Sequence, residues 1–147
     1  MITYCGSIQQ WECDHMGHLN VTGYMSRFNE ATWVLFSSVG IDREYMIENK
    51  IGMSAVRHEI NYTSELLPGD TCYIDSRVIA VGNSSLKVIH TLFKDPQSKI
   101  CASCSVTAVH IDRNSRKPIR IPNELRSSAV PNSENGRAIE PRSVENA

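Results

Sequence analysis

The feature that most constrains this sequence is one long apolar helix ahead of a series of strands. From Val21 onward, apolar residues recur at spacings of three and four, which predicts a helix over residues 21–39. Asn20 precedes it as a predicted N-cap and Gly40 follows it as a terminator. The recurring positions are Val21, Tyr24, Met25, Phe28, Ala31, Thr32, Leu35 and Val39. A helix with so wide an apolar face must be buried against a sheet.

The strands follow a second short helix, predicted over residues 43–48 after the cap Asp42. Beyond it the apolar period changes to two, which indicates strands. Strands are predicted at 2–9, 53–64, 72–81, 85–94 and 99–112, and a short final helical turn at 123–126. The long strands share an apolar face that only the long helix can cover. We therefore predict an α+β fold in which a curved antiparallel sheet wraps a central helix.

The length of 147 residues fits one domain. We expect that domain to span residues 1–128, because residues 129–147 are mostly polar and predict a disordered tail. The formal net charge of -1 gives no bulk attraction to nucleic acid or to an anionic membrane. We therefore expect neither as a partner.

The N-terminal residues and the cysteines predict a cytoplasmic protein. Residues 1–7 carry no basic side chain and no long apolar run follows them, so no signal peptide or membrane span is expected. Five cysteines without a secretion signal indicate reduced thiols. Cys101 and Cys104 are spaced as a C-x-x-C motif, but alternation along a strand would direct them to opposite faces, so we interpret them as packing residues. We expect neither a metal ion nor a cofactor.

A polar, non-periodic stretch at residues 10–18 carries the functional signal. The segment from Asp14 to Asn20 reads Asp-His-Met-Gly-His-Leu-Asn, with Tyr24 and then Glu30-Ala31 on the helix. It resembles the signature of the 4-hydroxybenzoyl-CoA thioesterase family. The later segments His58-Glu59-Ile60-Asn61-Tyr62, Pro68-Gly69-Asp70, Lys117-Pro118 and Ile121-Pro122 agree with it. The resemblance covers residues 3–125.

The resemblance implies a hotdog fold and hydrolysis of a small acyl-CoA thioester. It also implies a homodimer or a dimer of dimers, with active sites between subunits. One departure is Val21, where many relatives carry a second Asn. This removes a polar side chain from the pocket and leaves the backbone donor in place.

The resemblance assigns the catalytic groups to the loop and the helix start. Thioester hydrolysis needs a base or nucleophile near the carbonyl carbon, and Asp14 is the candidate. It also needs donors for the oxyanion, and the family position falls on the Val21 backbone N–H. Asn20 is primarily the N-cap, and as such it orients these donors. Alternatively, Asp14 only hydrogen-bonds its own loop.

Candidate substrate-binding residues are Trp11, Gly17, His18, Tyr24 and Glu59. Each also has a structural interpretation: Gly17 allows the loop to turn, His18 braces it, Tyr24 belongs to the core, and Glu59 lies exposed on a strand. The segment 11–18 is also similar to thioesterases associated with carnitine breakdown, which act on betainyl-CoA. The aromatic residues Trp11, Tyr24 and Trp33 suit its quaternary ammonium group, although Trp33 is better explained as core.

The phosphates of coenzyme A require Lys or Arg side chains to bind them, and the sequence does not favour one candidate cation over another. The candidates are Arg57, Arg77, Lys87, Lys94, Arg113 and Arg116.

Two other activities compete with thioester hydrolysis. A hotdog enoyl-CoA hydratase or dehydratase would pair His with a carboxylate in a different pattern, and a non-catalytic acyl-CoA-binding protein would normally need an effector domain.

Overall fold

The computed structural model describes residues 1–130 of the chain. Its elements in order are β1 (Ile2–Ser7), the 3-10 helix η1 (Gln10–Glu12), α1 (Val21–Ser38), α2 (Arg43–Glu48), β2 (Ile51–Tyr62), β3 (Thr71–Val81), β4 (Ser85–Lys94), β5 (Lys99–Asp112) and α3 (Asn123–Ala129). Most of the predicted tail, from residue 131 onward, lies outside the described residues. Among the helices of residues 1–130, none combines the length and the apolar character needed to cross a membrane.

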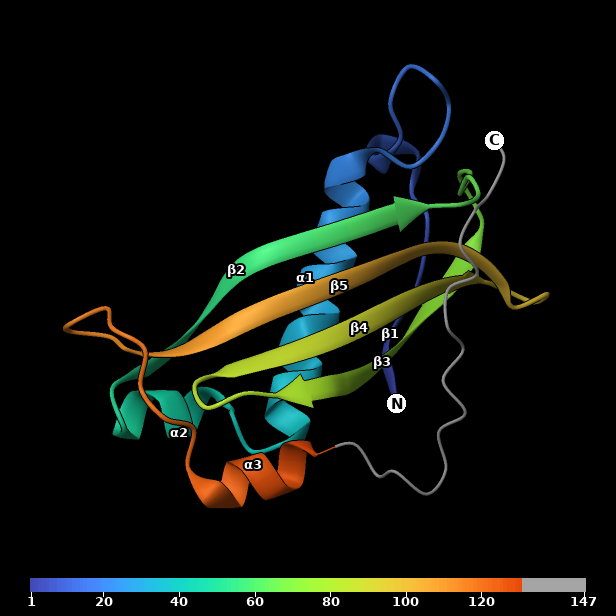
Figure 1. The fold of residues 1–147 in the computed structure, drawn as a ribbon. Helices are drawn as coiled ribbons and strands as arrows, with labels where there is room; N and C mark the ends of the chain where they lie inside the picture. Colours follow the sequence, from blue (N-terminus) through green and yellow to red (C-terminus); the bar gives the residue numbers. More distant parts are fainter. Residues whose placement is uncertain (131–147) are drawn as a thin grey trace.

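The five strands form one antiparallel sheet in the order β1-β3-β4-β5-β2. The sheet curves around α1, which crosses behind the strands (Figure 1). The meander β3-β4-β5 forms the middle of the sheet, and β2, which directly follows the helices, returns to the far edge beside β5. This arrangement confirms the predicted α+β hotdog fold.

Helix α1 begins where the sequence signals predict and ends one residue before the predicted end. The Asn20 side chain accepts a hydrogen bond from the Thr22 amide, and Gly40 follows the helix with a positive φ of 93°. A side chain at Gly40 would also come within 2.8 Å of Leu125. The buried face of the helix comprises Tyr24, Arg27, Phe28, Ala31, Thr32, Leu35 and Phe36. The Tyr24 ring packs against Tyr62, so the N-terminal end of α1 lies at the end of β2.

A buried polar network ties α1 to the sheet. His90 on β4 lies on the same face as Leu86, Val88 and Leu92, as the alternation predicts, and is fully buried. Its Nε2 is 2.9 Å from the Thr32 hydroxyl and its Nδ1 is 2.6 Å from the Ser76 hydroxyl. Burial lowers the pKa of His90 to about 4, so the ring is neutral near pH 7.

One packing prediction and one prediction of side-chain direction are wrong. Trp33, assigned to the core, is 42% exposed on the outer side of α1, because the buried stripe runs through Phe28, Thr32 and Leu35 instead. Cys101 and Cys104 are packing residues, as interpreted, but they do not point to opposite faces. The register between β4 and β5 shifts beside Cys101, and both thiols are fully buried in the core.

Candidate active site

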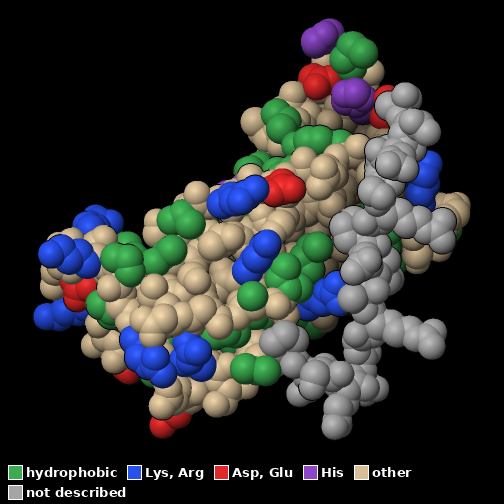
Figure 2. Space-filling view, in the orientation of Figure 1, with side chains coloured by type: hydrophobic (Ala, Val, Ile, Leu, Met, Phe, Trp, Pro, Cys, Tyr) green, Lys and Arg blue, Asp and Glu red, His purple; other side chains and the backbone are tan. Residues whose placement is uncertain are grey.

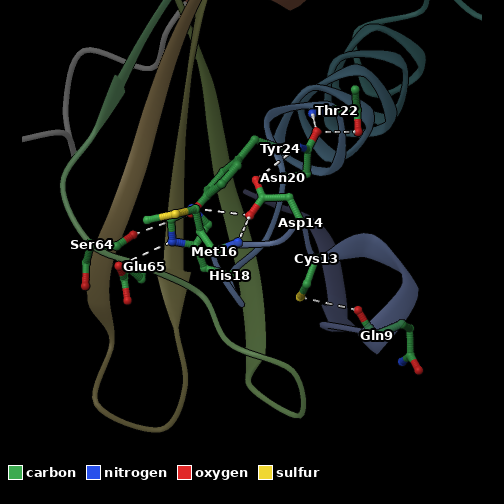
Figure 3. A network of polar contacts seen from close by, with 10 residues as sticks. All are labelled: Gln9, Cys13, Asp14, Met16, His18, Asn20, Thr22, Tyr24, Ser64 and Glu65. Carbon is green, nitrogen blue, oxygen red and sulfur yellow. Dashed lines mark hydrogen bonds and ion pairs between the residues drawn. The ribbon is translucent and has the colours of Figure 1, made fainter.

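A pocket of about 490 Å³ opens at the N-terminal end of α1. It lies between the loop that precedes the helix and the segment that follows β2 (Figure 3). Its lining residues are Asp14, His18, Leu19, Asn20, Val21, Tyr24, Tyr62, Thr63, Ser64 and Glu65. The first six flank the start of α1, and the last four are brought to them by the pairing of β2 with β5.

The Asp14 carboxylate is held by one backbone and one side-chain donor. Its Oδ1 accepts from the Met16 amide at 2.9 Å, and its Oδ2 accepts from the Asn20 side chain at 3.1 Å. The hydrogen bond from the Met16 amide has the larger effect, and together with that from Asn20 it keeps the pKa of this carboxyl below its ordinary value of 3.8. The side chain is 26% exposed, so a charged carboxylate faces the pocket at neutral pH.

Val21, the first residue of α1, also lines this pocket. Of the first four N–H groups of the helix, that of Thr22 donates to Asn20 Oδ1, and those of Gly23 and Tyr24 donate to the Asn20 carbonyl. Within residues 1–130, the Val21 N–H has no acceptor. Asn20 thus caps the helix and hydrogen-bonds Asp14, joining the carboxylate to an open donor.

His18 and Glu65 form the polar side of the pocket. His18 Nδ1 is 3.3 Å from Glu65 Oε1, and His18 Nε2 is 3.9 Å from Asp14 Oδ1. Glu65 lies in the segment after β2, so this contact joins the two walls of the pocket. His18 therefore braces the loop and also lines the cavity.

Tyr24 and Tyr62 supply an aromatic wall. Their ring centroids are 5.0 Å apart with the planes nearly perpendicular. The Tyr24 hydroxyl points to the Ser64 carbonyl at 3.5 Å, and burial raises the pKa of Tyr24 to about 12, so the phenol stays protonated. Tyr24 belongs to the core and to the pocket at once.

The lining carries two carboxylates, those of Asp14 and Glu65, and neither Lys nor Arg occurs in it. Two tyrosine rings complete this acidic surface. Such a lining attracts a cationic group, since both carboxylates and aromatic faces favour positive charge.

A buried ion pair fixes the segment that leads to Asp14. Arg27 on α1 bonds both carboxylate oxygens of Glu12, at 3.0 and 2.9 Å, with side-chain exposures of 4% and 26%. Arg27 also donates to the carbonyls of Ser7 and Gly23. The Glu12 carbonyl in turn accepts from the Asn20 amide at 3.0 Å. The pair thus holds the strand end, the loop and the helix start together.

Three predicted substrate-binding residues do not reach the pocket of their own chain. Trp11 is 81% exposed on η1. Gly17 lies in the exposed turn that begins at Asp14, where its φ of 79° is one that glycine adopts without strain. Glu59 lies on β2 in an exposed ion pair with Arg57, at 2.9 Å. None of the three lines the cavity.

Five lining residues were not predicted: Leu19, which lies between two predicted residues, and Tyr62, Thr63, Ser64 and Glu65 on the opposite wall. The signal of these last four in the sequence is a polar break between the end of a strand and the turn at Pro68-Gly69. The second carboxylate that lines the pocket is Glu65, six residues beyond Glu59.

Comparison with known proteins identifies the family. A family model described as the thioesterase-like superfamily matches residues 8–128. The chloroplastic acyl-acyl carrier protein thioesterase ATL3 of Arabidopsis thaliana is 23% identical over 123 residues, which are 84% of this chain. The chain spans 64% of the length of that relative.

Solved structures share the fold. A hypothetical protein of Staphylococcus aureus, in complex with CoA, superposes with a TM-score of 0.79 at 16% identity, over 87% of this chain and 81% of that one. The probable thioesterase YbaW of Escherichia coli gives 0.76 at 21% identity, over 87% and 96%. At these identities the likeness concerns the fold alone.

Proposed function

This chain belongs to the thioesterase-like superfamily, and we propose that it hydrolyses an acyl-CoA thioester in the pocket beside Asp14. The family agrees with the predicted class of thioester hydrolase. One observation carries the assignment of the site: the charged carboxylate of Asp14 and Val21, whose helix-terminal N–H has no acceptor within residues 1–130, line the same cavity.

In the proposed mechanism the thioester carbonyl lies between these two groups. Its oxygen accepts a hydrogen bond from the Val21 N–H, and the α1 dipole favours the negative charge that develops there. Acting as base, Asp14 takes a proton from water while the water oxygen attacks the carbonyl carbon. The C–S bond then breaks, and the thiolate leaves as CoA and receives the proton from Asp14. Direct attack by Asp14, followed by hydrolysis of the anhydride, gives the same products.

For the acyl group we propose a small cationic chain such as that of betainyl-CoA. The support is the composition of the lining: two carboxylates, two tyrosine rings and no basic side chain. A quaternary ammonium group placed against Tyr24 and Tyr62 would gain cation–π attraction, and Glu65 would neutralise its charge.

We further propose a homodimer formed through β2. This strand ends the sheet, and its residues 55–59 are exposed, with Val56 at 63%. An unpaired edge of this length is a ready surface for a second copy. Arg57 and Glu59 make the edge self-complementary, because antiparallel pairing centred on His58 sets Arg57 of each copy opposite Glu59 of the other.

A cytoplasmic location is part of the same proposal. All five cysteines are free thiols, which suits a reducing compartment.

The test is thiol release from short-chain, aromatic, long-chain and betainyl-CoA, followed with a thiol reagent. We expect wild type to release CoA, fastest from the cationic substrate, and Asp14→Asn to lose at least about a thousandfold in kcat. Equal inertness of both proteins on the whole panel would show a binding protein. Hydration of an enoyl-CoA without thiol release would show a hydratase.

If neutral short-chain substrates react faster than betainyl-CoA, the cationic specificity is wrong while the hydrolase assignment stands. Glu65→Gln separates these two claims further. It removes the proposed counter-charge of the ammonium group, so its effect on KM should be confined to cationic substrates.

A further inference from the structure

The pocket has no group of its own that suits the phosphates of coenzyme A. Its lining is acidic, as described above. At that end of the sheet, Lys94 is already paired with Asp70 at 2.8 Å. Lys99 is exposed next to Ile100, whose carbonyl accepts from Thr63 at 3.0 Å. Lys99 is therefore the same-chain alternative that a test must exclude.

Cations gather instead at the opposite end of β2. Lys50 precedes β2, and its carbonyl accepts a hydrogen bond from the Arg113 amide at 2.9 Å. Arg116 and Lys117 follow in the turn after β5. The side chains of all four cations are exposed: Lys50, Arg113, Arg116 and Lys117. Asp112 is the acidic residue of the turn, and it is engaged by the amides of Asn114 and Ser115. Figure 2 shows basic side chains grouped at this end of the molecule, where Figure 1 places the turn after β5.

These cations are remote from the pocket of their own chain. β2 has 12 residues, and at about 3.3 Å per residue its ends are about 36 Å apart. The pocket lies at one end, beside Tyr62, and Lys50 lies at the other. Within one chain, these cations therefore cannot bind the phosphates of a coenzyme A whose thioester lies in the pocket.

Antiparallel pairing of two β2 edges removes this separation. When the pairing is centred on His58, the residues opposite one another add up to 116, so Gly52 of one copy lies across from Ser64 of the other. A shift of two residues in the register leaves the start of one β2 beside the end of the other. Adjacent strands are about 4.8 Å apart, so the turn after β5 comes two strands from the pocket, within reach of a long arginine side chain.

Resting on the proposed function and its dimer, we propose that Lys50, Arg113 and Arg116 of the partner subunit bind the phosphate groups of coenzyme A. The thioester then reacts beside Asp14 of one subunit while the phosphates are held by the other. Arginine suits this task because its planar guanidinium binds phosphate oxygens in pairs.

The first test compares acyl-CoA with the same acyl group on pantetheine, which lacks the nucleotide phosphates. The double variant Arg113→Gln/Arg116→Gln should raise KM for acyl-CoA about tenfold, as expected for two exposed ion pairs. Its kcat, and its kcat/KM for acyl-pantetheine, should stay at the wild-type values. The matched control Arg77→Gln/Lys87→Gln removes two exposed cations from β3 and β4 and should change neither substrate.

The second test asks which subunit provides the cations. Asp14→Asn subunits, inactive but with intact cations, are mixed with Arg113→Gln/Arg116→Gln subunits. In the mixed dimer one site combines an intact Asp14 with the intact cations of its neighbour, so activity at low acyl-CoA should rise above the sum of the two separate proteins. Wild type mixed with the triple variant Asp14→Asn/Arg113→Gln/Arg116→Gln should show no such gain.

Failure of the phosphate-binding assignment can be distinguished from failure of the hydrolase assignment. An unchanged KM in Arg113→Gln/Arg116→Gln overturns the assignment of the partner's cations. A tenfold increase in KM produced by Lys99→Gln or by Arg77→Gln/Lys87→Gln instead also overturns it. The absence of a gain in the first mixture places the cations in the same chain. If wild type releases no thiol from either substrate, the proposed function itself fails.

Discussion

The ion pair between Arg27 and Glu12 gives the sharpest prediction about how the fold positions the site. Arg27 is almost fully buried and Glu12 about three-quarters buried, and two hydrogen bonds of 3.0 and 2.9 Å join them. Removal of one partner of a buried pair typically costs about 3–5 kcal/mol, because the other charge stays behind unpaired. Since Glu12 keeps some contact with water, the lower part of this range applies.

We expect Arg27→Met and Glu12→Gln each to lower the free energy of unfolding by about 3 kcal/mol. The double variant should lose about 4 kcal/mol and not the sum of the two, because it leaves no isolated charge, so the coupling energy is about 2 kcal/mol. Urea unfolding at a fixed protomer concentration measures all three values. Arg77→Met, which removes an exposed arginine of β3, should stay within about 0.5 kcal/mol of wild type.

The same variants test the link to the site. Glu12 accepts the Asn20 amide, and Asn20 bonds Asp14, so Arg27→Met should also lower kcat for thiol release at temperatures where the protein is fully folded. Additive single-variant effects, with a coupling below about 0.5 kcal/mol, would refute the claim that the pair stabilises the loop.

Two further predictions concern Asn20 and His90. Asn20→Asp should keep the cap on Thr22 but place a second carboxylate next to Asp14 Oδ2, which is 3.1 Å from the Asn20 amide nitrogen in the wild type. The repulsion raises the pKa of Asp14 in the folded state, so the acid limb of the kcat/KM profile should move to higher pH, and stability at neutral pH should fall. A profile that does not move would dissociate Asp14 from catalysis. Burial lowers the pKa of His90 from 6.5 to about 4 in the folded state, so on acidification the unfolded chain takes up this proton before the folded one does. The free energy of unfolding should therefore be highest above pH 6.5 and fall by about 3 kcal/mol toward pH 4. Urea midpoints across this range should slope in wild type and flatten in His90→Gln, and equal slopes would exclude His90 as the cause.

The helices and strands could be predicted because periodicity is a local property of the sequence. The bounds of α2, β4 and β5 agree with the prediction, and α1 ends one residue early. Local patterns fail where the chain departs from a regular period. The register shift beside Cys101 and the position of Trp33 outside the buried stripe are two such places.

The site was predictable only on the side that is contiguous in sequence. Asp14, His18, Asn20, Val21 and Tyr24 lie within eleven residues, and the structure brings all five to one pocket. The opposite wall depends on where β2 pairs with β5 and where it stops. That wall was missed, since strand ends are set by tertiary contacts. Glu65 was not among the candidates, and Glu59 has the exposed position of its structural interpretation.

The most direct test of the proposed site is the crystal structure of the protein with an inert acyl-CoA analogue in which a methylene group replaces the thioester sulfur. The ketone oxygen should lie about 2.7–3.1 Å from the Val21 nitrogen, with the carbonyl carbon facing the Asp14 carboxylate. An analogue bound with its ketone away from both groups, in every subunit, would contradict the proposed chemistry.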